Sequence, residues 1–341
     1  MSTEILIKDN RVKFKNTTFS NFKKSEVSKK LLKSIYYNKL EESFFWTCEM
    51  LCSNMLLELW ETFFILMSKY IHIDNPKLPI YISTKYQEFK DIIAENDNIE
   101  ILRNNSDIRI IFCTITTILC ESSKNTTLDN LQYKFEFKIE NLYNNLKAPN
   151  VDYIKLVYTE TDPKEYLIPF NEFIYHLTET REKVNIMYWL NWIIEYDILC
   201  RKKKKNIFCS SRGFYTNSKE HLERNIIWII WDIILKITEK NLTKDNQQLI
   251  NTIFQLFKVR YSLSTNKKRI FMIYHCIEIY FMNKNINFKI NVLNNKSLIT
   301  NLSKNINIIM EEIKKCEKYE NTPTTKSDKK IDVYKNIYMN L

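Results

Sequence analysis

The 341-residue chain contains a single glycine, Gly213, and this scarcity limits its fold more than any other feature of the sequence. Phosphate-cradling loops, dinucleotide-binding turns and nucleophile elbows are built around several glycines, so the enzyme classes that rely on them are excluded. Tight hairpins and left-handed helix ends also favour glycine, so turns here must use Asn, Asp and Ser. Because long helices need the fewest such turns, the sequence predicts an all-α fold.

The helical pattern divides the chain into two consecutive bundles. With 45% hydrophobic and 13% aromatic residues, the chain can bury a core in each of two domains. Apolar residues at helical spacing predict helices at about 26–37, 40–54, 56–72, 77–95 and 105–122, and then at 163–180, 183–203, 219–239, 246–264, 267–283 and 295–317. We predict an irregular N-terminal segment (1–25), a first bundle (26–123), a connecting region whose alternating aromatics allow short strands (124–162), a second bundle (163–317) and a mobile tail (318–341).

The two halves of the chain share short phrases. Those of the first half are echoed in the second as follows: Phe45-Trp46 by Tyr188-Trp189, Trp60-Glu61 by Trp231-Asp232, and the apolar run that begins at Arg109 by the run that begins at Arg269. The offsets between them are unequal, so the echoes indicate either a diverged tandem duplication with insertions or a coincidence. Two bundles of about five helices would suit a tandem cyclin-box architecture, which is an analogy at the level of the fold alone.

The charge balance favours an acidic partner. The formal net charge is +11 and the isoelectric point is about 9.0, which is typical of proteins that contact nucleic acid. Only nine of the 51 basic residues are Arg, which leaves 51 − 9 = 42 Lys. A lysine excess also follows from an AT-rich genome, and Lys lacks the forked geometry that reads base edges. The composition therefore indicates general attraction to polyanions and no sequence-specific recognition.

Two dense basic clusters are the candidate contact surface for nucleic acid. A run of five cations follows directly on a predicted helix, and a second run begins another; with one nearby arginine, the set is Arg201, Lys202, Lys203, Lys204, Lys205, Arg212, Lys267, Lys268 and Arg269. The five-residue run is also compatible with a nuclear import signal and, more readily, with an ordinary solvated helix end, where cations suit the negative end of the helix dipole.

Cysteines and histidines give no strong metal signal. Cys48 and Cys52 share one helix face, and Cys113 and Cys120 share another, but buried free Cys explains both pairs. A third group, Cys200, Cys209 and His221 with His275, lacks diagnostic zinc spacing. We therefore predict reduced thiols, no cofactor, no metal site and no catalytic residues. The absence of an apolar leader and of a bilayer-spanning run predicts an intracellular protein that does not insert into membranes.

Several phrases resemble an uncharacterised family of nucleocytoplasmic large DNA viruses, the giant viruses. They are Phe19 to Ser25 (FSNFKKS), Asn75 to Leu78 (NPKL), Lys147 to Asn150 (KAPN), Asp162 to Glu165 (DPKE) and Ile226 to Asp232 (IIWIIWD). The resemblance spans most of the chain and implies a viral context, with the protein in the host cytoplasm or viral factory, the nucleus or the virion. It carries no established activity. Relatives are richer in cysteine where this chain has Phe208 to Arg212, a departure that weakens a metal-site interpretation.

Together these features predict a non-enzymatic viral helical protein of genome replication, expression or packaging, with a basic surface that contacts nucleic acid without sequence specificity and with viral proteins as further partners. The alternative is a structural or scaffold protein of the virion or viral factory. In that case the lysines maintain solubility and the aromatic helices mediate protein–protein contacts.

Overall fold

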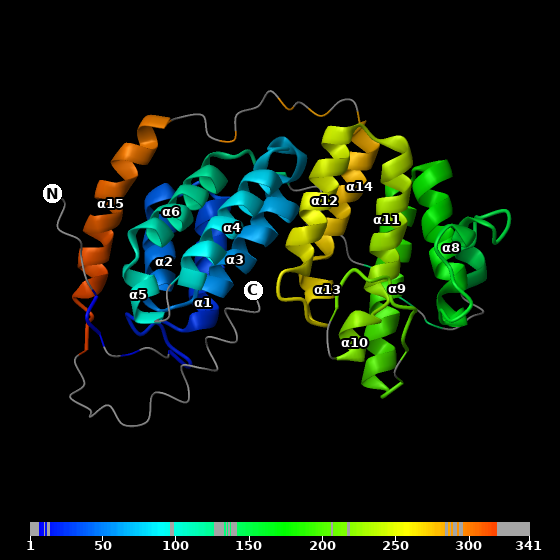
Figure 1. Ribbon diagram of the computed structural model, residues 1–341, viewed down its shortest axis with the longest axis horizontal. Coiled ribbons are helices and arrows are strands. Elements are labelled where there is room, and N and C mark those ends of the chain that lie inside the picture. The colour runs from blue at the N-terminus through cyan, green and yellow to red at the C-terminus, as the bar shows by residue number, and fades with distance from the viewer. Residues whose placement is uncertain are drawn as a thin grey trace. The chain divides into compact units, whose positions relative to one another are not determined.

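The computed structural model describes residues 7–9, 11, 14–95, 99–125, 133, 135, 137, 142–205, 207–216, 219–283, 286, 288, 292 and 296–318. Within these residues the regular structure is helical (Figure 1), and the β-pairing is limited to one isolated bridge between Thr17 and Lys23. The predicted all-α fold is confirmed. No helix in this part of the chain combines the length and apolarity needed to cross a membrane.

The helices form two compact units. Unit 1 combines residues 1–125 with residues 287–341, and unit 2 comprises residues 126–286. The chain therefore begins in unit 1, continues through unit 2, and returns to unit 1, where the last helix that the structure describes lies. This division differs from two consecutive bundles, because the C-terminal part of the chain belongs with the N-terminal part.

Unit 1 is built around α2, whose side chains are buried along almost its whole length. Its helices are α1 (Lys24–Tyr36), α2 (Leu40–Cys52), α3 (Leu56–Ile65), α4 (Leu78–Glu95), α5 (Ile99–Asn104), α6 (Ser106–Glu121) and α15 (Lys296–Lys314). The α3 helix continues into a π-helical turn (Leu66–Ile71) and a 3-10 turn (His72–Asp74). Helices α1, α6 and α15 pack on α2, and only its first turn, with Glu41 and Glu42, is exposed.

The position of α15 corrects the sequence prediction. We expected a helix at 295–317 to complete the second bundle, but α15 packs on α2 and α6 in unit 1 (Figure 1). Its apolar stripe of Ile306, Met310 and Ile313 joins a buried cluster with Cys48 and Cys113. The amphipathic pattern correctly predicts a helix with one buried face, but it does not tell which core that face will cover.

The described part of the N-terminal segment is irregular and braces unit 1. The Asp9 carboxylate accepts hydrogen bonds from the Arg11 guanidinium (2.6 Å) and from the Lys318 backbone N–H (2.7 Å), just beyond α15. Arg103 donates to the backbone carbonyls of Asp9 and Arg11. The chain before α1 therefore ties the end of α15 to the end of α5. Residues 1–6, 10, 12 and 13 of this segment, and residues 319–341 of the predicted mobile tail, lie outside the described residues.

Unit 2 has a core rich in tryptophan, with Trp189, Trp228 and Trp231 almost completely buried. Its helices are α8 (Leu167–Tyr175), α9 (Lys183–Lys202), α10 (Glu220–Glu223), α11 (Ile227–Asn241), α12 (Lys244–Lys258), α13 (Thr265–Lys268) and α14 (Ile270–Met282). A π-helical turn (His176–Thr180) extends α8.

The predicted connecting region, 124–162, contains short 3-10 turns (Tyr143–Asn145 and Tyr153–Leu156) and no strand among its described residues. Residues 126–132, 134, 136 and 138–141, on which much of the strand prediction falls, lie outside the described residues.

One pair of echoing tryptophans, Trp60 and Trp231, makes similar ring contacts in the two units. Trp60 of α3 packs against rings of the following helix α4, Tyr86 and Phe89, with centroids 5.0 and 5.5 Å away. Trp231 of α11 packs in the same way against Phe254 and Phe257 of the following helix α12, at 5.0 and 5.1 Å. Equivalent helices thus carry equivalent aromatic contacts, which is the pattern that a diverged duplication would leave.

The two arginines of the echo also have the same role. Arg109, in the first turn of α6, donates from Nε to the carbonyl of Arg103 near the end of α5 (3.0 Å). Arg269, just before α14, donates to the carbonyls of Phe257 and Val259 at the end of α12 (2.8 and 2.7 Å). Each buried guanidinium therefore satisfies backbone carbonyls at the end of an earlier helix, α5 for Arg109 and α12 for Arg269.

We expect Met310→Ala to loosen α15 from α2, because it removes a fully buried side chain from the shared cluster. Loss of a buried Met costs about 2–4 kcal/mol, which amide hydrogen exchange across α2 would register as faster opening. Ile308→Ala on the same helix is the control, since Ile308 is 60% exposed; its effect should stay within about 0.5 kcal/mol. Equal effects of the two substitutions would contradict the packing of α15 in unit 1.

Candidate nucleic-acid interface

The basic run at 201–205 forms the C-terminal end of α9. The helix ends at Lys202, and the chain turns out of it through Lys204 in the left-handed conformation (φ 57°). The Lys205 N–H donates to the Cys200 carbonyl (2.9 Å), which closes the helix end without glycine. Lys202, Lys203 and Lys204 are exposed, and none of them forms an ion pair with a described carboxylate. Three adjacent ammonium groups are thus presented to solvent from a fixed helix end.

The two cations that flank these lysines are already paired. Arg201 lies 2.8 Å from the carboxylate of Asp197, one turn earlier on α9, and Lys205 lies 2.8 Å from Glu165. The Asp197 side chain is nearly buried, and this burial raises its pKa, although Arg201 opposes the shift. Arg201 therefore compensates a buried carboxylate, and the charge left over at the helix end is that of the three lysines.

A chain of buried polar side chains holds the end of α9 against α11 and α13. Asn225 donates to the Asp197 carboxylate, and the Asn225 Oδ1 accepts from Asn266 Nδ2 (2.9 Å). The Tyr261 hydroxyl donates to Asn266 Oδ1 (2.8 Å), and its burial raises the Tyr261 pKa far above the usual range. Each member is hydrogen-bonded, so the network fixes the geometry of this corner and does not destabilise the core.

The second basic run lies beside α9. Lys267 of α13 pairs with Glu195 of α9 at 2.7 Å, and Lys268 is exposed. Glu195 and Lys202 are seven residues apart, which places them on one face of the helix about 10 Å apart. The run at 267–268 therefore lies beside α9, joined through the Lys267–Glu195 pair to the helix face that also carries Lys202.

Arg269 does not belong to that surface. It is only 5% exposed, and its guanidinium caps the end of α12. The sequence placed it with Lys267 and Lys268 because the three are adjacent. Its side chain instead points into unit 2, and its burial takes it out of the predicted contact surface.

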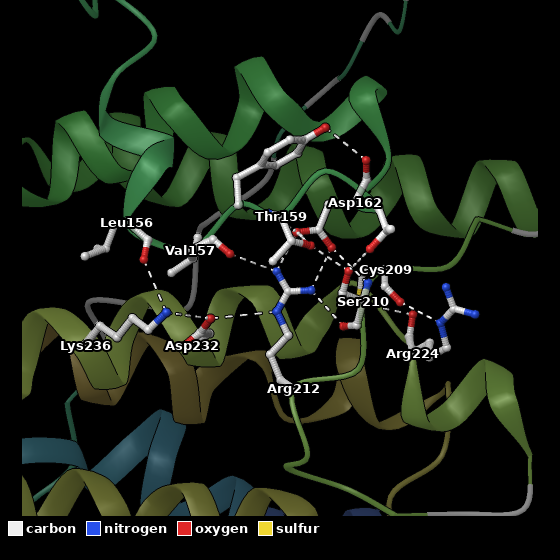
Figure 2. Close-up of polar contacts among 12 residues, drawn as sticks. Leu156, Val157, Thr159, Asp162, Cys209, Ser210, Arg212, Arg224, Asp232 and Lys236 are labelled. Atoms are coloured by element: carbon white, nitrogen blue, oxygen red, sulfur yellow. Dashed lines mark hydrogen bonds and ion pairs between the residues drawn. The ribbon is translucent and has the colours of Figure 1, made fainter.

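Arg212 is buried in an ion pair with Asp162 (Figure 2). Two parallel bonds join the guanidinium to the carboxylate, Nη1 to Oδ1 at 2.7 Å and Nη2 to Oδ2 at 2.6 Å, and the side chains are 6% and 0% exposed. Arg212 also donates to the carbonyls of Val157 (3.1 Å) and Ser210 (2.7 Å). Its Nε lies 3.7 Å from Asp232 on α11. Arg212 is therefore an internal clamp between two loops and a helix, and its burial removes it from the predicted contact surface.

The Asp162 carboxylate is held ionised by its neighbours. Burial by itself would raise its pKa, but hydrogen bonds from Arg212, from the Thr159 N–H (2.9 Å) and from the Ser210 N–H (2.9 Å) outweigh this, so the pKa of Asp162 lies below its ordinary value. Every contact is supplied by the protein itself, which leaves this carboxylate no lone pair for a ligand.

Cysteines named from the sequence form hydrogen bonds within the protein. The Cys209 thiol donates to the carbonyls of Arg224 and Asn225, both at 3.2 Å, and burial raises the pKa of Cys209 to about 12. Cys48 and Cys113, on facing helices α2 and α6, hydrogen-bond to each other in the core, where Cys48 has a raised pKa. No three His, Cys, Asp or Glu side chains converge in metal-binding geometry within the part of the chain that the structure describes.

The sequence prediction did not include one further exposed cation of unit 2. Arg260 is exposed in the turn between α12 and α13 and has a left-handed backbone (φ 46°). It precedes Tyr261, whose ring belongs to the network that anchors the end of α9. An isolated arginine forms no charge run, so sequence alone gave no reason to group it with Lys267 and Lys268.

Comparison with protein-family models, with curated proteins and with solved structures gives no match to this chain.

We expect Arg212→Ala to destabilise unit 2 by about 3–5 kcal/mol, because it leaves the Asp162 carboxylate buried and uncompensated. Urea unfolding would measure the loss. Lys155→Ala removes an exposed ion pair with Asp152, whose side chains are 76% and 59% exposed, and serves as the control with an expected change below about 1 kcal/mol. A loss for Arg212→Ala no larger than that of the control would show that the clamp does not stabilise the fold.

The same pair should give a defined pH dependence. Since the folded pKa of Asp162 is depressed, its stabilising contribution is fully present above the unfolded value of about 3.9 and is lost as pH falls through the lower folded value. The stability difference between the wild type and Asp162→Asn should stay constant from about pH 5 to 8 and shrink below about pH 4. A difference that shrinks near neutral pH instead would contradict this assignment.

Proposed function

We propose that this chain is a non-enzymatic helical protein that binds nucleic acid without sequence preference, through the exposed cations at the end of α9 and beside it. The viral context implied by the resemblance places this binding in genome replication, expression or packaging. The binding surface comprises Lys202, Lys203, Lys204, Arg260, Lys267 and Lys268. The observation that carries the proposal is the three consecutive exposed lysines that lack a described carboxylate partner on a rigidly anchored helix end.

The anchoring supports binding because it fixes where the charges lie. The buried network through Asp197, Asn225 and Asn266 holds α9 against α11 and α13, so the lysines extend from a backbone that is ordered before a ligand arrives. A compact set of cations concentrates the field better than scattered ones do, and it attracts phosphates at long range.

The chemistry of the surface predicts how it would bind. Ammonium groups contact phosphates as point charges and release counterions, which makes the affinity steeply dependent on salt and nearly independent of sequence. The arginines that could read guanine by two parallel bonds are mostly engaged elsewhere, as the buried guanidinium of Arg212 illustrates.

The test is the triple substitution Lys202→Gln, Lys203→Gln and Lys204→Gln. We expect it to weaken binding to unrelated DNA sequences and to make the slope of log affinity against log salt shallower by about 2–3, roughly one for each lost phosphate contact. Fluorescence anisotropy across a salt series would measure both. Lys205 is left in place because its removal would unpair Glu165.

A second triple variant provides the control. Lys29 and Lys33 are exposed lysines on α1 of unit 1, Lys240 is exposed in the last turn of α11, and their replacement by Gln removes the same total charge. We expect it to change the slope by less than about 1. Equal losses in the two variants would reject the α9 end as the contact surface. No binding at low salt would reject nucleic-acid binding altogether and favour a scaffold function.

A further inference from the structure

A cluster of six aromatic rings lies along α9, next to the basic surface. Tyr188, Trp192 and Tyr196 recur every four residues and so form one stripe of the helix. Three further rings, from residues that precede α8 in the chain, pack onto this stripe. We call these six residues the α9 ring cluster: Tyr133, Phe135, Phe137, Tyr188, Trp192 and Tyr196. From the sequence alone, the alternating aromatics of the connecting region indicated only possible short strands.

The rings form a continuous ladder. Phe135 lies 5.3 Å from Tyr188, and Phe137 lies 5.4 Å from Trp192, measured between ring centroids. Trp192 and Tyr196 stack at 4.9 Å with an interplanar angle of 17°. The α9 part of the ladder spans eight residues, or about 12 Å of helix, which is long enough to face several successive bases.

The cluster adjoins the buried rings of Tyr166 and Trp189 but is itself mostly partly exposed. Trp192 is buried, whereas the other five rings are partly exposed to solvent. The Tyr188 hydroxyl accepts a hydrogen bond from Asn145 (3.0 Å), which fixes the direction of that ring. Rigid, partly exposed aromatic faces are what bases stack on in proteins that bind single strands.

Cations border the ladder at the end where it meets the lysine run. Lys205 is close enough to Tyr196 to act on its pKa, and Lys267 pairs with Glu195, the residue before Tyr196. Beyond them, Lys202 ends the same helix, and Lys203 and Lys204 form the turn that follows it. Aromatic faces and positive charge are therefore arranged in sequence along one element, so a strand that stacks on the rings would bring its phosphates to the lysines.

We infer that the ligand of this surface is a single-stranded polynucleotide, with bases stacked on the α9 ring cluster and phosphates held by the lysines at the helix end. The inference rests on the proposed function and narrows its substrate class. Duplexes present phosphates but keep their base faces stacked internally, so only an unpaired strand can use both parts of the surface. Stacking accepts every base, which agrees with the lack of sequence-reading arginines.

The experiment uses the full chain and four labelled probes of about 20 nucleotides, longer than the roughly 4–16 nucleotides that a single-strand site covers. The probes are oligo(dT), oligo(rU), a duplex, and an abasic deoxyribose-phosphate strand that keeps the charges and lacks the bases. We expect both single strands to bind about tenfold or more tightly than the abasic strand, because only they can stack. Preference of oligo(rU) over oligo(dT), or the reverse, identifies the natural strand. Wild-type protein that binds abasic and base-bearing strands equally overturns the inference without any mutation.

Two paired variants test the rings themselves. Tyr188→Leu with Tyr196→Leu removes two rings but keeps apolar bulk, and should lower oligo(dT) affinity to the abasic level while the abasic affinity stays unchanged. Tyr188→Phe with Tyr196→Phe keeps the rings and should bind like the wild type. Tyr37→Leu replaces a 60% exposed ring on unit 1 and is the control for loss of a surface aromatic.

The outcomes separate the two proposals. If the Leu pair binds oligo(dT) as the wild type does, the stacking inference fails and the charge-based function stands. If no probe binds at low salt, both fail. The lysine triple variant should weaken binding of all four probes, whereas the Leu pair should weaken binding of the base-bearing single strands only.

Discussion

The structure depends on how helices end in a chain with almost no glycine. The last carbonyls of a helix need hydrogen-bond donors, and a glycine in the left-handed conformation is the usual means of supplying them. Here asparagine takes that conformation at several turns, namely Asn21, Asn38, Asn54 and Asn283. Elsewhere a cation is drawn in: the Lys124 ammonium donates to the carbonyls of Leu119 and Ser122 at the end of α6 (2.8 and 2.6 Å), and Arg269 caps α12. Basic side chains are thus part of the internal architecture.

This requirement divides the two basic residue types between the interior and the surface. A guanidinium offers five donors in a fixed fork and can satisfy several carbonyls or a carboxylate at once, so it suits buried positions such as those of Arg103, Arg109 and Arg212. An ammonium is more strongly hydrated and more often remains exposed, as at Lys202 to Lys204, with Lys124 as an exception. The surface charge of this protein is therefore mainly lysine, and a lysine surface attracts phosphates without reading bases.

The same division explains what sequence could and could not predict. Helices followed from apolar periodicity to within a few residues, as for α9, predicted at 183–203 and found at Lys183–Lys202. The docking of α15 could not be predicted in this way, because an amphipathic stripe specifies which face of a helix is buried but not which helices it packs against. Arg212 was assigned to the surface because its partner, Asp162, is 50 residues away in the sequence, and no local pattern links them. For Arg269 a signal did exist: it echoes Arg109, and both begin strongly apolar runs, where a buried capping role is more natural than a solvated one.

The lysine run lies between two of these internal anchors, and this gives its position physical meaning. Before the run, Asp197 ties α9 to Asn225 at the start of α11; after it, Arg212 clamps the following loop to Asp162. Exposed lysines usually sit on a backbone whose local freedom must be reduced when a ligand binds. Here the conformational cost of ordering that backbone is met during folding, by buried contacts that no ligand touches. The lysine side chains alone remain to be ordered on binding. Individually weak contacts between the lysines and phosphates can then act together, because the core fixes the spacing of the backbone positions that carry the lysines.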